Sequence, residues 1–541
     1  MNAAPYTPDG LPGSGIAQGA FFAVFGTGLG PATPQAATAF PLPTSGGLGG
    51  TAVQVNVGTT SLYAVTMFTS ASQLLGILPS RTPVGAGTMT VTYNGQTSPP
   101  QPIQVVPNSF GVFAVNEGGF GPAVVTDPQY QLITNGHSAN PGDILTIWRT
   151  GLGAVPGDES LAPPTPVNLT NLLVSVMIGG TPANVLYQGR SGCCAGLDQI
   201  AFQVPAGIVG CSVPLAVSVN GVVSNFTSSS IAQTGAECAV PVPAGAPSLP
   251  DSVTSTLQSG GSVAVAEAGF ARVQLGIFGA VADDVGEGGL AYFYKYSGSP
   301  TALLSNLAQT SAADGYAPAP QFQPGSCFAG TTLGPHSGGP GESFLGLDAG
   351  ASVVFSAGSE VITDPQTATG VYGANVWLQP SPAVLGYLSF GSLALNGSGG
   401  TDVGAFTANA VLAPPLMNLN LPAPGTTIAR NQDLTIAWTG GGTDYVTISG
   451  DVFVSTCPTP CTTIPLPGYY AGFSCLANAG DGSFTVPAWV LSTLPASAIG
   501  HDLDGLFVAQ GSFGTYFTAP GLDLGILNYF DTIGSYSFSY Q

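Results

Sequence analysis

The tetrapeptide TGLG occupies residues 150–153 and occurs a second time at residues 27–30. Each copy follows an apolar run, at residues 144–148 and 21–25, and each precedes a proline-containing loop. Because glycine alone adopts a positive φ without steric cost, an apolar run that ends in Gly-x-Gly predicts a strand followed by a sharp turn. The two copies therefore predict two equivalent strands in a duplicated structure.

Further short segments repeat in the same order after the two tetrapeptides. The matched pairs are residues 53–58 with 174–179, 78–79 with 204–205, 84–85 with 209–210, 93–95 with 219–221, and Ser98 with Ser224. The offset between the copies starts at 123, falls to 121 and settles at 125 to 126. Small loop insertions between fixed strands produce such a drift, so we predict two tandem copies of one domain.

Alternation of apolar and polar residues predicts half-buried strands at residues 51–57, 88–93 and 102–106. The Asn-Gly pairs at residues 94–95 and 220–221 are typical hairpin turns. Residues 488–494, after Pro487, are the one segment that reads as a short helix. The sequence therefore predicts an all-β protein, with tandem Ig-like β-sandwich domains connected by Pro/Gly-rich linkers.

Composition shifts divide the chain into four expected domains. Residues 1–107 and 108–238 are the two Ig-like repeats, the second with an inserted disulfide loop. A proline-rich linker opens at residue 239, and Pro414-Pro415 marks a later boundary. We therefore expect a β-rich domain over residues 239–415 and a C-terminal Ig-like β-sandwich over residues 416–541.

The acidic net charge argues against nucleic acids and anionic membranes as partners. The chain has 6 Lys and Arg against 27 Asp and Glu, a net charge of −21, and such a surface repels phosphate backbones and anionic membranes. No run of 18 apolar residues is present, so we expect no membrane insertion. Residues 1–4 have neither the charged start nor the apolar core of a signal peptide.

Eight cysteines, an even number, predict disulfides and an oxidising, extracellular location. A trans peptide holds adjacent sulfurs apart, so we expect one of Cys193 and Cys194 to bond Cys211 and the other Cys238. Cys475 is expected to bond Cys457 or Cys461, while the sequence leaves the partner of Cys327 open. A zinc site at Cys457, Cys461 and Cys475 is the alternative, although no histidine lies near.

The repeats resemble a family of uncharacterised extracellular proteins that is abundant in Acidobacteria (Solibacter-type). The residues that carry this resemblance are GTGLGP at 26–31, LPS at 78–80, TPVG at 82–85, TGLG at 150–153, GLDQI at 196–200 and VPAG at 204–207. The repeats of that family are similar to Ig-like IPT/TIG domains. The resemblance implies secretion and a β-sandwich fold, and it brings no catalytic residue.

Candidate chemistry in the sequence is sparse. The three histidines are far apart and G-x-S-x-G is absent, so we assign no catalytic residue. Asp283, Asp284 and Glu287 form a dense acidic group that could bind Ca²⁺ in a loop or remain solvated. The same group, or Asp502 with Asp504, could supply the carboxyl pair of a glycoside hydrolase. We expect no other cofactor.

Three tyrosines alternate over residues 292–296 and would stack on sugars if exposed, or pack in the core if buried. The chain has one lysine, Lys295, whereas natural sheets commonly protect their edges with lysine. We therefore expect an uncharged edge to pair with another chain, and we place it at Tyr536, Phe538 and Tyr540 near the end of the sequence.

The expected function is that of an extracellular structural or adhesive protein, such as a filament or surface-layer subunit, that acts by self-association or attachment to a cell surface. The alternative is a multidomain protein that binds carbohydrate or another exopolymer, and a glycoside hydrolase-like enzyme is third. We expect no enzyme activity and no nucleic-acid partner.

Overall fold

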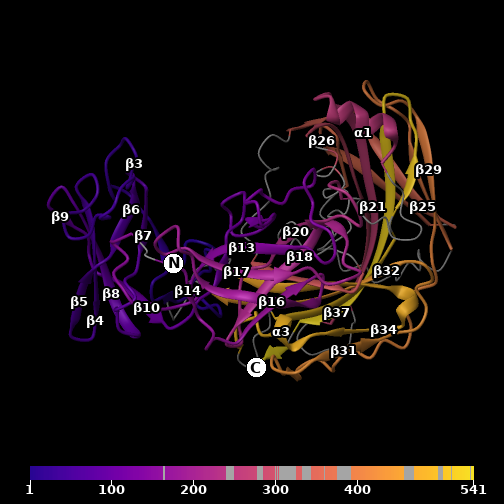
Figure 1. The fold of residues 1–541 in the computed structure, drawn as a ribbon. Helices are drawn as coiled ribbons and strands as arrows, with labels where there is room; N and C mark the ends of the chain where they lie inside the picture. The colour runs from indigo at the N-terminus through magenta and orange to yellow at the C-terminus, as the bar shows by residue number, and fades with distance from the viewer. Residues whose placement is uncertain are drawn as a thin grey trace. The chain divides into compact units, whose positions relative to one another are not determined.

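The computed structural model describes residues 1–162, 165–238, 249–276, 284–298, 300, 303, 324–331, 343–358, 360–373, 391–455, 468–497, 504–512, 514–536 and 538–541. The chain divides into two compact units, Met1–Val240 and Pro241–Gln541. Strands dominate both units, as predicted (Figure 1). The described helices are short: α1 (Asp251–Gln258), the 3₁₀ turn η3 (Ala479–Asp481) and α3 (Ala488–Leu491).

The first repeat is a sandwich of two sheets. Its larger sheet has the order β1 (Ile16–Ala17), β10 (Gln101–Val106), β8 (Gly85–Tyr93), β4 (Thr51–Val57) and β5 (Thr60–Tyr63), with β9 (Gln96–Thr97) beside β8. Its smaller sheet has the order β2 (Phe21–Phe25), β7 (Gln73–Ile77), β6 (Val65–Thr69) and β3 (Gln35–Ala36). Alternate residues of β4 are buried, and Val53 and Val55 pack with Phe22 and Leu74 of the facing sheet.

The second repeat contains the corresponding strands in one connected set. The order is β11 (Gly111–Val112), β13 (Ile144–Thr150), β17 (Asp198–Gln203), β16 (Thr181–Arg190), β15 (Val174–Ile178), β18 (Gly210–Val219) and β19 (Val222–Val223). Three further strands pair at its sides: β12 (Val125–Thr126), β14 (Val167–Asn168) and β20 (Thr227–Ile231). The long strand β16 joins the two layers because it pairs with both β15 and β17, with a register shift between Val185 and Tyr187.

Strand register agrees with the sequence repeat where β2 pairs with β7 and β13 pairs with β17. Phe21 lies opposite Ile77 in the first repeat, and Ile144 lies opposite Gln203 in the second. The offsets are 123 on one strand and 126 on the other, the same values that the sequence repeats give. Both Asn-Gly pairs form tight hairpins with positive φ at each residue, because Asn94 and Gly95 have φ 47° and 79° and the second pair has 51° and 85°.

The TGLG turns share a buried leucine, Leu29 in one copy and Leu152 in the other. They differ at the first glycine. Gly28 has a φ of +69° with open space around it, whereas Gly151 has a φ of +101° and a Cβ there would lie 1.9 Å from the Ser109 carbonyl oxygen. The second copy therefore requires glycine for close backbone packing as well as for its conformation.

The second unit is built on one sheet. Its order is β23 (Ser326–Thr331), β33 (Gly468–Asn478), β32 (Tyr445–Ser455), β35 (Gly505–Gly511), β37 (Leu524–Tyr536), β21 (Val263–Gly276), β22 (Asp284–Ser297), β27 (Val371–Tyr372), β26 (Glu360–Ala368), β25 (Ser352–Ala357), β28 (Ser392–Gly397) and β29 (Phe406–Val411). Side strands are β24 (Ser343–Gly346) on β22 and β36 (Thr515–Phe517) on β37. Two small pairs complete the unit, β30 (Thr427–Ile428) with β38 (Ser539–Tyr540) and β31 (Leu434–Ala437) with β34 (Ser483–Val486).

This sheet corrects the expected boundary between residues 239–415 and 416–541. β21 and β37 run parallel and pair continuously from Val265 opposite Leu524 to Gly276 opposite Ser535 (Figure 1). A strand from each expected domain therefore lies in the middle of one sheet. The core beneath it also draws on both segments, since Phe270, Phe355 and Tyr529 belong to one buried cluster.

Of the helices α1 and α3, the sequence predicted only α3. α3 follows Pro487, as predicted, and buries Val490 and Leu491. α1 was not predicted, because residues 250–258 were read as the end of a linker and the start of a β-rich domain; it buries Val253 and Leu257 against β21 and β22. Within the described residues, no helix is long and apolar enough to span a membrane.

Candidate functional site

The described cysteines form three disulfides, Cys193–Cys194, Cys211–Cys238 and Cys327–Cys475. The predicted pairing was wrong. Cys193 and Cys194 bond each other, which leaves Cys211 and Cys238 to pair. Cys475 bonds Cys327 because the two residues lie directly opposite each other on β33 and β23. Cys457 and Cys461 lie outside the described residues.

The candidate Ca²⁺ ligands cannot be placed as a site. Asp283 lies outside the described residues, and of Asp284 and Glu287 only the backbone is described, in β22. Among the described residues no group of three His, Cys, Asp or Glu side chains is arranged to hold a metal ion. Ca²⁺ binding by these three residues stays a prediction.

The expected pairing edge at the end of the sequence was also wrong. Phe538 and Tyr540 are 1% and 0% exposed, and β38 pairs with β30 of the same unit. The Tyr540 hydroxyl donates to the Gly505 carbonyl oxygen over 2.6 Å. The backbone of Tyr536 ends β37, where it pairs with Gly505. On the other side of β38, the Tyr540 N–H donates to Ser497 Oγ and the Tyr540 carbonyl oxygen accepts the Ser497 N–H, so this strand has no free side for another chain.

The tyrosine row of β22 packs inside the unit. Tyr294 and Tyr296 are buried, and the Phe344 ring lies 5.2 Å and 5.3 Å from their ring centroids. The Tyr294 hydroxyl donates to the buried Glu267 carboxylate. Core packing, and not an exposed sugar-stacking row, is therefore the role of these two residues.

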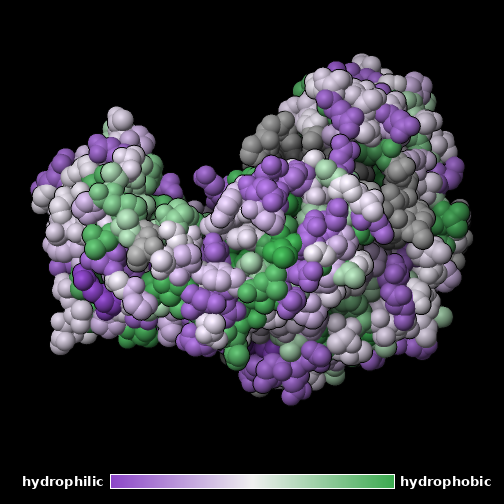
Figure 2. Space-filling model, in the orientation of Figure 1, coloured by the Kyte–Doolittle hydropathy of each residue, from purple (hydrophilic) through white to green (hydrophobic). Residues whose placement is uncertain are grey.

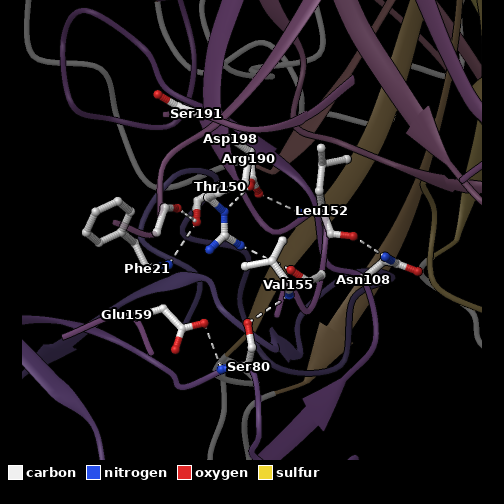
Figure 3. A network of polar contacts seen from close by, with 12 residues as sticks. Phe21, Ser80, Asn108, Thr150, Leu152, Val155, Glu159, Arg190, Ser191 and Asp198 are labelled. Atoms are coloured by element: carbon white, nitrogen blue, oxygen red, sulfur yellow. Dashed lines mark hydrogen bonds and ion pairs between the residues drawn. The ribbon is translucent and has the colours of Figure 1, made fainter. Parts of the chain in front are cut away.

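The densest group of buried charges in the first unit lies where the two repeats meet (Figure 3). Arg190, the last residue of β16, donates from Nε to Oδ1 of Asp198, the first residue of β17, over 2.6 Å. The other Asp198 oxygen accepts the Leu152 backbone N–H over 2.8 Å. Arg190 also donates from Nη2 to the Gly153 carbonyl oxygen over 3.1 Å. This cluster, Arg190 with Asp198 and the TGLG turn of residues 150–153, is called the junction cluster below.

The junction cluster reaches the first repeat through backbone and hydroxyl groups. The Phe21 N–H donates to Thr150 Oγ1 over 2.8 Å, and that hydroxyl donates to the Gly196 carbonyl oxygen over 3.0 Å. A second connection runs through Ser80, whose N–H donates to Glu159 Oε1 and whose Oγ accepts the Val155 N–H, both over 3.0 Å (Figure 3). Ser80 and Glu159 are both buried, so these bonds are shielded from water.

Arg149 adds a second buried guanidinium. Its side chain is fully buried, and its Cζ lies 4.1 Å from the centre of the Phe110 ring, which is cation–π geometry. None of its three guanidinium nitrogens has a hydrogen-bond partner among the described residues. Burial lowers the pKa of Arg149, while the negative charge of Asp198 opposes this shift. Asp198 is therefore the counter-charge for two arginines.

The chemistry of the junction cluster is that of a structural connection. Both carboxylate oxygens of Asp198 already accept hydrogen bonds, and the hydroxyl of Thr150 both accepts and donates. Sequence reasoning did not identify this cluster. Two signals pointed to it: Asp198 lies in the GLDQI segment of the resemblance, and Arg149 and Arg190 are two of only 6 basic residues in the chain.

An apolar contact accompanies the polar one. Ala195 belongs to a buried cluster with Leu42, Val65 and Ile77 of the first repeat. A Cβ on Gly196 would lie 3.0 Å from Ile77 Cγ1 and 3.2 Å from the Phe21 ring. The segment of residues 191–197, called the junction loop below, therefore packs directly on the first repeat.

Comparison with known proteins gives no family. No protein family matches the chain, and no curated protein matches it. Solved structures with some likeness include domains 5–6 of the S-layer protein SbsC, at 13% identity and a TM-score of 0.15, covering 41% of this chain and 95% of that chain. Immunoglobulin domains 1–5 of Sidekick-1 match at 10% identity and a TM-score of 0.11, covering 98% and 99%.

The FN1–FN3 domains of chicken CNTN1 match at 8% identity and a TM-score of 0.14, covering 75% of this chain and 98% of that chain. Likenesses at these scores carry no argument about function. The function has to be argued from the residues of this chain.

Proposed function

We propose that this protein is an extracellular structural protein that acts by self-association, through the open edge of the sheet in its second unit. The observation that carries the proposal is β29, the last strand in the order of that sheet. β29 pairs with β28 along its whole length, from Phe406 opposite Gly397 to Val411 opposite Ser392, and with no other described strand.

The sequence of β29, FTANAV, contains no charge. Phe406, Ala408 and Ala410 are buried, whereas Thr407, Asn409 and Val411 are exposed, the last by 83%. An edge strand directs half of its backbone N–H and C=O groups away from its sheet, and an uncharged edge is a template for strand addition. A second copy of this chain offers the same uncharged strand, and two such edges can pair antiparallel about a two-fold axis.

The exposed surface is consistent with association. Apolar side chains lie among polar ones on the face shown in Figure 2. The three described disulfides support an oxidising location. The net charge of −21 opposes contact between copies, so association through β29 should strengthen when salt screens that repulsion.

Binding of carbohydrate or another exopolymer is the second candidate, and one surface feature favours it. An open hollow of about 570 Å³ on the second repeat is lined by amide, aromatic and aliphatic side chains that include Asn168, Tyr187, Gln188, Leu173 and Leu186. A second hollow, of about 590 Å³, lies over β25, β28 and β29. None of the described residues that line either hollow carries a carboxyl group, whereas a glycoside hydrolase needs an acid pair.

The test is the sedimentation of the full chain over a range of concentration and salt, for the unchanged protein and for Asn409→Lys. The substitution places a charge on the exposed side of β29, so we expect assembly to be lost while the circular dichroism spectrum is retained. Ser356→Lys is the matched control. Ser356 lies on β25, two strands inward from β29, and on the same face of the sheet as Asn409, because both residues lie opposite Ala394 of β28. Unlike β29, β25 is paired on both sides.

Assembly that persists in Asn409→Lys, or an unchanged protein that stays monomeric at high concentration and salt, would overturn the proposal. Binding to a polysaccharide column that is lost in Tyr187→Ala, by a protein that stays monomeric, would favour the second candidate.

A further inference from the structure

We propose that the Cys193–Cys194 disulfide is a thiol-exchange site, and that its reduction releases the junction loop from the first repeat. Both cysteines are exposed, and both lie in the junction loop. The proposal concerns the first unit and does not depend on self-association through β29.

The position of the disulfide connects it to the junction cluster. The junction loop begins directly after Arg190 and ends directly before Asp198, the two members of the buried ion pair. Ser191 holds the first turn of the loop, since its Oγ accepts the Cys193 N–H over 3.1 Å and lies 2.9 Å from Cys193 Sγ. A change in the backbone at these cysteines is therefore transmitted along a segment that is fixed at both ends.

The residues immediately after the disulfide make the contact with the first repeat. Ala195 packs in the cluster with Ile77, and the Gly196 carbonyl oxygen accepts from Thr150 Oγ1, which in turn accepts the Phe21 N–H. Cys194 is thus one residue from an apolar contact and two residues from a hydrogen-bonded bridge between the repeats.

The chemistry requires a dithiol reductant. A thiolate of the reductant attacks one exposed sulfur, forms a mixed disulfide and expels the other cysteine as a thiolate. The second thiol of the reductant then resolves the mixed disulfide. Two electrons and two protons pass to the protein, which gains two thiols, and the reductant leaves as its own disulfide.

Exposure makes this site selective. Cys211, Cys327 and Cys475 are 8%, 4% and 0% exposed and Cys238 is half-buried, so a thiolate reaches the sulfurs of these two disulfides less readily than those of Cys193 and Cys194. Cys193 and Cys194 are both open to solvent. A mild dithiol should therefore reduce this disulfide and leave Cys211–Cys238 and Cys327–Cys475 intact.

Reduction increases the conformational entropy of the junction loop. The bonded cysteines form a closed ring that restricts the backbone torsions of both residues. Opening the ring returns conformational freedom to both residues, which the contacts of Ala195 and Gly196 must then offset. We expect the loop to detach more often and the Phe21 N–H to lose its protection from hydrogen exchange.

The experiment combines mass mapping and hydrogen exchange on the full chain. After treatment with a low concentration of dithiothreitol, iodoacetamide should label Cys193 and Cys194 and leave the other described cysteines unlabelled. Exchange in peptides that cover residues 21 and 195–197 should become about tenfold faster, while peptides from β32 and β33 of the second unit serve as the internal control.

The variant Cys193→Ser/Cys194→Ser removes the bond without a reductant. It should show the faster exchange from the start and should not respond to dithiothreitol. Labelling of Cys193 and Cys194 before reduction would overturn the proposal, because it would show free thiols. Equal exchange rates in the oxidised, reduced and doubly substituted proteins would overturn it as well.

Discussion

Arg190 and Asp198 form an ion pair of 2.6 Å in which the arginine side chain is 4% exposed and the aspartate side chain is fully buried. The two residues are the end of one strand and the start of the next, so the pair closes the base of the junction loop. Removing one partner of such a buried pair strongly destabilises the fold, because the remaining charge then has neither water nor a counter-charge.

The substitution Asp198→Asn should therefore destabilise the first unit strongly. Arg190 and the nearby Arg149 would both remain buried without their negative partner, and we expect the free energy of unfolding to fall by about 3–5 kcal/mol. Denaturant unfolding measures this loss. Glu237→Gln, which neutralises an exposed carboxylate of the same unit, is the control and should change stability by less than about 0.5 kcal/mol. An equal effect of the two substitutions would contradict the role of the ion pair.

Ser98 and Ser224 make the same hydrogen bonds in the two repeats, and substituting them tests the duplication. Ser98 Oγ accepts the Val91 N–H over 3.1 Å, and Ser224 Oγ accepts the Val217 N–H over 3.0 Å. Alanine at either position leaves a backbone donor unpaired and should cost about 1–3 kcal/mol. Ser224 is buried and Ser98 is half-buried, so Ser224→Ala should cost more. Thermal unfolding of both variants gives the comparison, and the reverse order would contradict this interpretation.

Asp364 should make the second unit less stable as the pH rises. Asp364 is 6% exposed, its carboxyl group lies near the Phe355 ring, and burial raises the pKa of this carboxyl group to about 6. Because the folded state holds this proton more tightly than the unfolded chain, its stabilising effect is complete below about pH 4 and is lost as the pH rises through about 6.

Asp364→Asn should remove this dependence and raise the free energy of unfolding at pH 7 by about 1–3 kcal/mol. Unfolding of both proteins between pH 4 and pH 7 measures the difference in slope. Parallel pH profiles for the two proteins would show that Asp364 titrates normally.

Local features of the fold could be predicted from the sequence because local physics determines them. The hairpins at Asn94-Gly95 and Asn220-Gly221 need a positive φ at two successive residues, and this requirement selects the Asn-Gly pair. Strand β4 alternates between buried and half-buried residues, as its sequence pattern predicts. The repeat offsets reappear in the register of β2 with β7 and of β13 with β17, because residues within a strand cannot be inserted without changing the face that each side chain occupies.

Long-range pairings could not be predicted in the same way. The prediction for Cys475 favoured the cysteines nearest in sequence. Closing a loop of 148 residues costs only about 2 kcal/mol more than closing one of about 15, and the pairing of β23 with β33 holds Cys327 opposite Cys475. The junction cluster was missed for a similar reason. Arg149, Arg190 and Asp198 look like scattered charges until β13, β16 and β17 align them.

The parallel pairing of β21 with β37 has a consequence for how the chain folds during synthesis. Arg272 and Asp531, opposite each other in this pairing, are separated by 259 residues. Every contact inside the first unit is available before β37 emerges from the ribosome, whereas the second sheet lacks a central strand until then. The first unit can therefore fold while the chain is still being made, whereas the strands of the second unit's sheet stay exposed for longer and are more open to aggregation.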